Sequence, residues 1–396
     1  MNRVGRLTLN SMRFRAFAGA MCVSLLVGTT AFAGRQPSEA TRKIEQVIAA
    51  TDLKPIEGCK DLATHKARIK RMKAWAGVID RVVRAQPRAF EAWLTGQVEP
   101  PVQVKTEAVH FLECMIRQMI RDASRPDSRL VVAVEKFRSR AKMRQLHRIM
   151  RRKPSYAARL IGRIVRSSRR NAKRQGDIWR DKLDLKIKRR FGPVSSYAAR
   201  LCMPGRYWKP WASSHRVCWF GRLSPKERQR EVLIASSPPG LSRHHWGTDH
   251  DLFTVDGDAF LPRNRHFDEL QWLRKHAQSF GFYLPYDGGQ LQGHNHIAEP
   301  WHWSYFPIAE PLQHSILARE SAFGRTLTQM WRQLQSRWNH HGDYFSYVVG
   351  VWARYLGDTT APPGVTRTAS TSQNNAGGST GRASLKKSRP MAHRSK

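Results

Sequence analysis

Two short segments of the sequence carry the side-chain types that a catalytic metal needs. The first contains His244 and Asp251, and the second contains Glu299 and His302. Catalytic zinc takes three protein ligands from His, Asp and Glu and keeps one position open for water. A spare carboxylate can then act as the base for that water. The two segments together offer two histidines and a carboxylate as ligands, with one glutamate left over, which predicts metal-assisted hydrolysis.

The backbone around these residues is not a helical metal motif. No His-Glu-x-x-His pattern is present, Gly247 permits a tight turn, and Pro300 excludes an ordinary helix interior. In a regular strand, Glu299 and His302 would face opposite sides. We therefore expect a bend near Pro300 if both side chains point at one metal.

The two segments also resemble a known family. The order Ser-x-His-x-x-Gly-x-x-x-Asp followed by Glu-x-Trp-His is similar to that of the D-alanyl-D-alanine carboxypeptidases and dipeptidases of the vancomycin-resistance type. These are zinc peptidases that share their fold with lysostaphin-like enzymes. The matching residues, within residues 205–310, are Ser242, His244, Gly247, Asp251, Glu299, Trp301 and His302. The resemblance implies that His244, Asp251 and His302 hold zinc and that Glu299 is the general base and then the general acid.

The same resemblance implies an upstream arginine that stabilises the developing oxyanion. The segment Ser214-His215-Arg216 is similar to that motif, although the glutamine that usually follows a few residues later is missing. An arginine suits this role because a fixed cation stabilises charge that develops in a dry site. We therefore expect Arg216 in the site, with Arg222 as the alternative.

Three neighbours of the expected ligands are candidates for supporting or substrate contacts. They are Ser242, Asp249 and Trp301. Asp249 stands where the family pattern commonly has a small residue. It either orients His244 or His302 through a hydrogen bond, or caps a turn. The alternative for Trp301 is packing in the core.

The elements that must position these residues change in character along the chain. Apolar residues at helical spacing predict helices over residues 36–190. After residue 205 the chain is dense in aromatic residues, proline and glycine, with strand-like pieces at 231–235, 250–255 and 301–307. Helices are expected at 265–280, with Gly281 as its C-cap, and at 314–339. The pattern predicts an α+β catalytic domain with a small antiparallel sheet, preceded by an all-helical basic domain.

Four regions follow from these patterns. Arginines, an apolar run and Ala31-Phe32-Ala33 predict a signal peptide over residues 1–33, and the run is too short for the alternative of a membrane anchor. The basic helical domain is expected at 34–204, the catalytic domain at 205–357 and a disordered basic tail at 358–396. No transmembrane segment is expected after the signal is removed, and the protein is expected to be periplasmic or secreted.

The charge of the chain is strongly positive and unevenly distributed. The formal net charge is +39, with +14 in residues 151–200 and −2 in residues 241–350. Such a field attracts polyanions. Because export is expected, we favour an anionic envelope surface as the partner of the basic domain. A nucleic-acid binder is disfavoured because no recognised module is present, and a proteome-wide basic bias is the alternative that needs no ligand.

Export also changes how the cysteines are interpreted. Four remain after the signal, namely Cys59, Cys114, Cys202 and Cys218, and an even number in an oxidising compartment predicts disulfides. Three pairings are possible. Order along the chain favours Cys59 with Cys114 and Cys202 with Cys218, and the second bridge would fix the backbone beside Arg216. Four buried free thiols are the alternative.

Together with the metal-binding pattern, the resemblance implies zinc-dependent hydrolysis of D-alanine-containing peptides, the stem peptides of peptidoglycan. An endopeptidase that cuts the cross-link would differ only in its subsites, which the sequence does not expose. The alternative from another class is a non-catalytic wall-binding protein. The spare glutamate and the complete ligand set argue against that alternative.

Overall fold

The computed structural model describes residues 36–365, except for 126, 127, 129, 131–139, 203, 204, 206, 288–296 and 339–341. The expected signal peptide and residues 366–396 of the expected tail lie outside the described residues. The start of that tail is packed, since Thr359 is 6% exposed and accepts a hydrogen bond from Gln313. No helix in the described part of the chain is long and apolar enough to cross a membrane.

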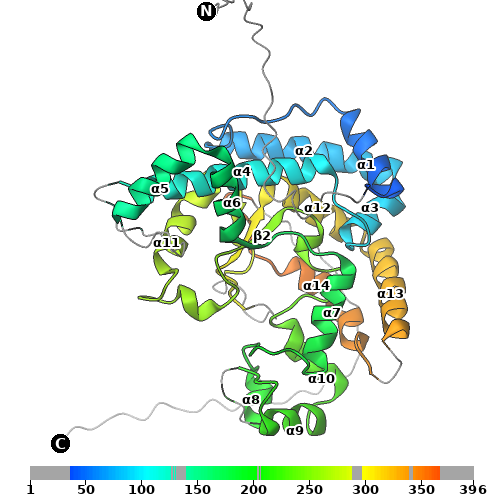
Figure 1. Cartoon of the computed structure of the whole chain (residues 1–396). Helices are drawn as coiled ribbons and strands as arrows, with labels where there is room; N and C mark the ends of the chain where they lie inside the picture. The colour runs from blue at the N-terminus through cyan, green and yellow to red at the C-terminus, as the bar shows by residue number, and fades with distance from the viewer. Residues whose placement is uncertain are drawn as a thin grey trace, which may run out of the picture. The chain divides into compact units, whose positions relative to one another are not determined.

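A four-stranded antiparallel sheet lies among the helices (Figure 1). Its strands, in spatial order, are β1 (Val165–Ser167), β2 (Asp249–Leu252), β4 (His302–Tyr305) and β3 (Phe282–Tyr283). The sheet joins segments that are far apart in the sequence, because β1 pairs with β2 and β2 pairs with β4. The prediction of a small antiparallel sheet in an α+β fold is confirmed.

Helices form most of the remaining described chain. They are α1 (Glu39–Ala49), α2 (His65–Ala85), α3 (Pro87–Leu94), α4 (Val102–Ala123), α5 (Arg140–Arg152), α6 (Pro154–Ile164), α7 (Ala172–Leu183), α8 (Ser196–Cys202), α9 (Ser213–Gly221), α10 (Pro225–Leu233), α11 (Phe267–His276), α12 (Phe306–Ala318), α13 (Glu320–Arg337) and α14 (Ser346–Gly357). The short 3-10 turns are η2 (Arg243–His245), η3 (Gly257–Phe260) and η4 (Ala277–Phe280).

The N-terminal helices pack directly on the sheet. Glu107 of α4 accepts hydrogen bonds from the hydroxyl of Tyr305 in β4, at 2.8 Å, and from Nε1 of Trp75 in α2, at 3.1 Å. The ring of Phe111 stacks on that of Tyr305 with centroids 5.6 Å apart. Up to Val365 the described chain forms one compact unit, so the boundary expected between residues 204 and 205 does not separate two cores.

The expectation that residues 34–204 are all helical is wrong at β1. These three residues form a strand because β2 offers its edge, with Val165 opposite Leu252 and Ser167 opposite Asp251. A strand of three residues is too short for alternating hydrophobicity to predict it from the sequence. As a consequence, the basic half of the chain supplies an edge strand of the sheet, next to β2.

Three other expected elements can be compared with the structure. Residues 231–235 were expected as a strand, but residues up to Leu233 belong to α10, which starts with Ser224 and Glu227 in a capping box. The helix expected at 314–339 is two helices that separate at Arg319. The helix expected at 265–280 is present as α11 and η4, and Gly281 ends it with a φ of 79°.

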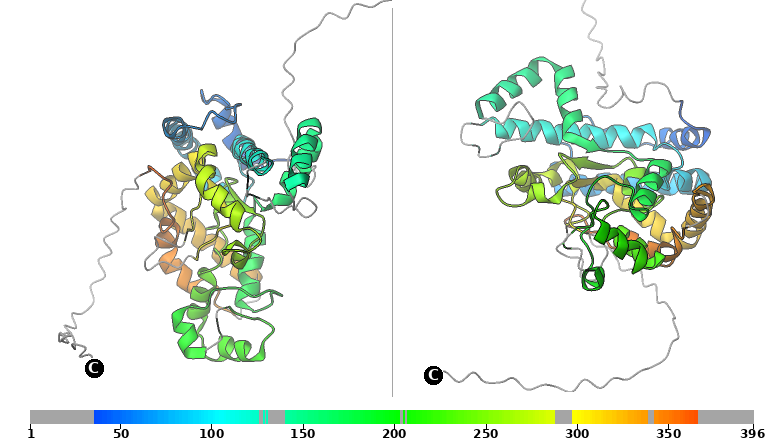
Figure 2. Two further views of the ribbon diagram at one scale, coloured as in Figure 1. Left: turned by 90° about the vertical axis from the view of Figure 1, so that its left-hand side faces the viewer. Right: turned by 60° about the horizontal axis from the view of Figure 1, so that its bottom comes forward.

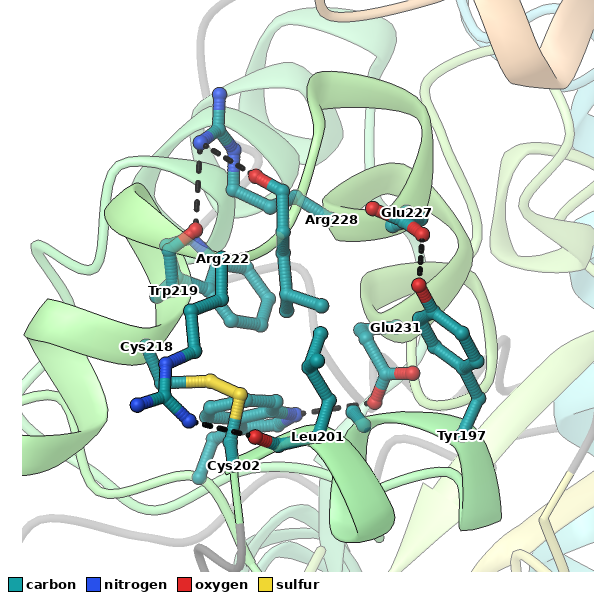
Figure 3. The surroundings of a disulfide bond; sticks show 12 residues. Tyr197, Leu201, Cys202, Cys218, Trp219, Arg222, Glu227, Arg228 and Glu231 are labelled. Atoms are coloured by element: carbon teal, nitrogen blue, oxygen red, sulfur yellow. Dashed lines mark hydrogen bonds between the residues drawn. A yellow bond between two sulfur atoms is a disulfide. The ribbon is translucent and has the colours of Figure 1, made fainter.

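The four cysteines form two disulfides in the pairing favoured by their order along the chain. Cys59 is joined to Cys114 with Cα atoms 5.4 Å apart, and Cys202 to Cys218 with Cα atoms 5.7 Å apart. The second bridge ties the end of α8 to the middle of α9 (Figure 3).

Candidate metal centre

The pairing of β2 with β4 brings the expected ligands together. Asp251 lies directly opposite His302 in the strand register, and His244 lies in η2, just before β2. Oδ1 of Asp251 is 3.2 Å from Nε2 of His244 and 3.4 Å from Nδ1 of His302. All three side chains are buried, with at most 4% of each residue exposed. The three ligand atoms lie within 4.8 Å of one another, as one shared metal ion requires.

The hydrogen bonding of this cluster fits a cation. Oδ1 of Asp251 is buried and has no hydrogen-bond partner, which is costly for an ionised oxygen unless a cation balances it. Burial alone would lower the pKa of His302, but the carboxylates of Asp249, Asp251 and Glu299 beside it raise that pKa well above its usual value. The surroundings of His302 therefore favour positive charge, which a metal ion at Nδ1 would supply in place of a proton. Two imidazoles and a carboxylate are a donor set that suits a divalent transition metal.

The outer contacts of both histidines set their tautomers. Nδ1 of His244 is 2.5 Å from the backbone oxygen of Ser168, which can only accept, so Nδ1 donates and Nε2 is free to face Asp251. Nε2 of His302 is 2.9 Å from Oδ1 of Asp249 and donates to it, which leaves Nδ1 free. In each histidine the nitrogen without a proton faces the same point.

Asp249 lies where its carboxylate can fix the tautomer of His302. Side chains two residues apart in a strand point to the same face, so Asp249 and Asp251 lie on one side of β2. Oδ1 of Asp249 also accepts from Nε of Arg243 at 3.0 Å, and both residues are fully buried. Burial opposes ionisation of Asp249, but Arg243 and His302 outweigh it and hold the pKa of this carboxyl well below its usual range. Of the two roles expected for Asp249, its contacts match the orientation of His302.

Arg243 is itself held by a buried polar network. One terminal nitrogen donates to Ser304 at 2.7 Å and to the hydroxyl of Tyr283 at 3.0 Å, and the other donates to Gln313. The guanidinium also lies over the ring of Trp246, 4.6 Å from its centroid. A buried charge with this many partners is stable only while its carboxylate partner stays in place.

The bend expected at Pro300 brings Glu299 next to the cluster. The backbone nitrogen of His302 donates to the backbone oxygen of Glu299 at 2.9 Å, which closes a tight turn. The turn brings Oε2 of Glu299 to 3.3 Å from Nδ1 of His302. The side chain of Glu299 is 19% exposed, more than the three expected ligands, so it remains accessible to a substrate.

The arginine that the structure brings to the cluster is Arg170, and Arg216 lies elsewhere. Arg170 follows β1 and donates to Oδ2 of Asp251 at 2.5 Å. Arg216 is exposed on α9, where it reaches the backbone oxygen of Leu185, and the alternative, Arg222, donates to the backbone oxygen of Leu201. Figure 1 shows α9 at the lower end of the described unit, whereas β2 lies near its centre.

A sequence signal for Arg170 was present. The glutamine that does not follow Arg216 does follow Arg170, five residues later, as Gln175. Oε1 of Gln175 is 3.4 Å from a terminal nitrogen of Arg170, and Oγ of Ser167 accepts from its Nε at 3.0 Å. The pairing of Arg170 with Gln175 was not recognised, because the segment around them has the pattern of a long basic helical region.

His245 is a further residue of the site that sequence reasoning did not assign. Its Nδ1 donates to the backbone oxygen of Arg170 at 2.6 Å, and its Nε2 accepts from the backbone nitrogen of Gly240 at 3.0 Å. Burial lowers the pKa of His245 to about 3, so the ring is neutral. Both nitrogens are used, so His245 holds the backbone of Arg170 instead of taking part in the metal cluster.

The two remaining candidates have structural contacts. The backbone oxygen of Ser242 accepts from the backbone nitrogen of His245 at 2.9 Å, which starts η2. Trp301 is 9% exposed, and its ring lies 6.5 Å from that of Phe260. Its backbone oxygen accepts from Leu252 at 2.8 Å. These contacts match the core alternative for Trp301.

Comparison with known proteins agrees with this geometry. The family described as VanY, D-alanyl-D-alanine carboxypeptidase, matches residues 110–308, half of the chain, and the match includes β1, β2 and β4. The chain is therefore a hydrolase of the carboxypeptidase type. It belongs to the VanY D-alanyl-D-alanine carboxypeptidase family. An uncharacterized protein of Haemophilus influenzae is 34% identical over 106 residues, and the match covers 23% of this chain and 72% of that protein. No solved structure matches.

Proposed function

We propose that this protein is a zinc-dependent D-alanyl-D-alanine carboxypeptidase that acts on the stem peptides of peptidoglycan. The observation that carries the proposal is the unpartnered Oδ1 of Asp251, which faces the free nitrogens of His244 and His302. Membership of the family supports the carboxypeptidase reaction. The donor set supports zinc, which is commonly bound by three ligands of these types.

The residues of the chain divide the chemistry between them. Zinc, when bound by His244, Asp251 and His302, would act as a Lewis acid and bring the pKa of bound water to about 7. Oε2 of Glu299 takes the proton of the attacking water and passes it to the nitrogen of the leaving D-alanine. Arg170, whose side chain is 23% exposed, donates to the oxygen that becomes negative as the tetrahedral intermediate forms. The bonds from Gln175 and Ser167 keep its guanidinium oriented.

Digestion of purified muropeptides tests the proposal. With zinc, we expect pentapeptides to lose one alanine from the carboxyl end, and a chelator should stop this loss. Conversion of cross-linked dimers to monomers without loss of terminal alanine would instead support the endopeptidase alternative. Intact muropeptides under all conditions, with zinc bound, would support a non-catalytic wall-binding protein.

Metal content is a separate test of the ligands. Purified protein should carry one zinc per chain, and His302→Ala should not, because it removes a ligand that faces Asp251 at 3.4 Å. A His302→Ala variant that retains stoichiometric zinc would refute the assignment.

Export is tested independently, since a mature protein that begins at Gly34 in periplasmic extracts is the expected product of the signal peptide.

We also propose that the basic half binds an anionic surface of the cell envelope. Residues 136–176 contain no Asp or Glu. The exposed basic residues of α5, α6 and the adjacent segments are Lys142, Arg144, Arg148, Arg152, Lys153, Arg159, Arg163 and Arg166. Binding to isolated cell walls should weaken as salt rises, because the screening length is about 10 Å at 0.1 M and shorter above that. Binding that does not change with salt, or with glutamine at these positions, would contradict the proposal.

A further inference from the structure

A second exposed surface has a different chemistry from the basic half. Trp211, Val217 and Phe220 are 61%, 68% and 47% exposed, and they lie in α9 and the residues just before it. All 13 tryptophans of the chain fall within the described residues, and only Trp211 is exposed. We refer to Trp211, Val217 and Phe220 as the apolar tip.

Folding does not account for the apolar tip. Helix α9 already buries one face, which carries His215, Cys218 and Trp219. Val217 and Phe220 are three residues apart and so lie together on the opposite face. A surface helix usually presents polar residues on its outer face. An apolar outer face is therefore a feature that needs a contact outside the chain.

The tip is held firmly by the fold. The disulfide between Cys202 and Cys218 ties α9 to α8 (Figure 3). Nε1 of Trp219 donates to the backbone oxygen of Leu183 at 2.8 Å, and its ring packs against Trp208 with centroids 4.7 Å apart. Figures 1 and 2 show α8 and α9 at one end of the described unit, away from the sheet. The disulfide and the contacts of Trp219 thus hold the segment that carries the three side chains in place.

The segment that carries the tip is basic. Residues 196–230 contain eight Lys or Arg and one acid, Glu227. Glu227 accepts from the hydroxyl of Tyr197 at 2.5 Å and from the backbone nitrogen of Ser224 at 2.7 Å, which directs it toward α8 and its own helix cap. Arg216 and Arg228 lie over the ring of Phe220, at 5.5 Å and 5.6 Å from its centroid. Arg216 and Arg222 are both exposed.

We propose that the apolar tip docks on the surface of an anionic phospholipid bilayer. Tryptophan and phenylalanine insert at the boundary between head groups and acyl chains, while arginines beside them bind the phosphates. Charge complementarity selects an anionic bilayer, since Glu227 is the one acid in this segment. A protein partner fits less well, because a stable protein interface needs about 800 Å² on each side. Three exposed apolar side chains at one end of the unit are sufficient for partial insertion.

Vesicle binding of the full-length chain tests this inference. The chain should sediment with vesicles of equal parts phosphatidylglycerol and phosphatidylcholine, and Val217→Ser with Phe220→Ser should lower the partition coefficient at least about tenfold, given the transfer energy of buried apolar side chains. The matched control is Val255→Ser with Val349→Ser, since both valines are 46% exposed but lie elsewhere in the chain. Equal loss in the control pair, or no loss in the tip pair, would overturn the inference.

Two measurements separate the tip from the basic half. At high salt the basic half is screened, so the binding that remains should depend on Val217 and Phe220. Iodide quenches exposed indoles, and Trp211 is the one exposed tryptophan of the described chain. Anionic vesicles should protect this fluorescence from iodide, and Trp211→Phe should remove the quenchable fraction. Quenching that vesicles do not change would overturn the inference, as would a tip that instead makes the chain dimerise without lipid.

Discussion

Substitution of Asp249 by Asn tests the part of the site that departs most from the family pattern. The change keeps the shape of the side chain and removes its charge. Oδ1 of Asp249 accepts from Nε2 of His302 at 2.9 Å and from Nε of Arg243 at 3.0 Å. The carboxylate therefore both orients a proposed zinc ligand and neutralises a buried cation. Loss of the charge should weaken zinc binding and destabilise the fold, and the two effects can be measured separately.

The size of the metal effect follows from the charge on one hydrogen bond, because the amide oxygen of Asn can still accept from His302. A hydrogen bond to a charged group is worth about 1.5–3 kcal/mol and a neutral one about 0.5–1.5 kcal/mol, so the change removes about 1–1.5 kcal/mol. Each 1.4 kcal/mol is about tenfold in affinity. Asp249→Asn should therefore raise the zinc Kd about tenfold, the lower end of the usual effect of changing an outer partner of a metal-bound histidine. The stability effect has another source, because Arg243 is fully buried and loses its carboxylate partner.

Competition with a chelator of known zinc affinity measures the Kd, and thermal unfolding of the metal-free protein measures stability. Tyr283→Phe is the matched control. It removes a hydroxyl that accepts from Arg243 at 3.0 Å and donates to Glu310 at 2.5 Å, so it should lower Tm and leave the zinc Kd unchanged. If Asp249→Asn binds zinc as tightly as the unsubstituted protein, Asp249 is only a structural partner of Arg243. The inference that its charge strengthens the metal site through His302 would then fail.

Three further predictions concern the reaction and the second disulfide. Glu299→Gln should retain zinc and lower kcat about 10²–10⁴-fold, because an amide cannot take a proton; near-normal turnover would assign the base elsewhere. Arg170→Gln should lower kcat/KM about 10²–10³-fold, whereas Arg216→Gln on the exposed face of α9 should leave it within about twofold, and steady-state kinetics that reverse this order would restore Arg216. Replacing Cys202 and Cys218 by Ser should lower the free energy of unfolding by about 3 kcal/mol, measured by urea titration, with kcat unchanged at low temperature; an unchanged midpoint would mean that the bridge does not restrain the unfolded chain.

The part of the site that was predictable from sequence is the part encoded locally. His244 and Asp251 lie in one short segment, and Glu299 and His302 lie in another, so their spacing survives as a readable pattern. The backbone geometry was also predictable in part. A proline between two polar residues that must point the same way requires a bend, and the bond from the nitrogen of His302 to the oxygen of Glu299 forms it.

Arg170 was not predictable from the same pattern, because its place in the site depends on a long-range contact. It lies 81 positions before Asp251, to which it donates. Its neighbours are basic and helix-forming on both sides, and the three residues of β1 become a strand only because β2 provides hydrogen-bond partners. Secondary structure that arises from tertiary pairing leaves little trace in local propensity. The downstream Gln175 was the one local sign.

The basic half of the chain therefore has a second role beside its charge. It supplies the backbone oxygen of Ser168 that fixes the tautomer of His244, and it supplies Arg170, whose backbone His245 holds in place. His244, a proposed ligand that the local motif identifies, is oriented by Ser168, which lies outside that motif. A metal site needs its ligands held by outer partners as well as present. We therefore expect that the exposed charge of α5 and α6 can change without affecting the chemistry, whereas Arg170 and the path of the backbone from β1 to α7 cannot.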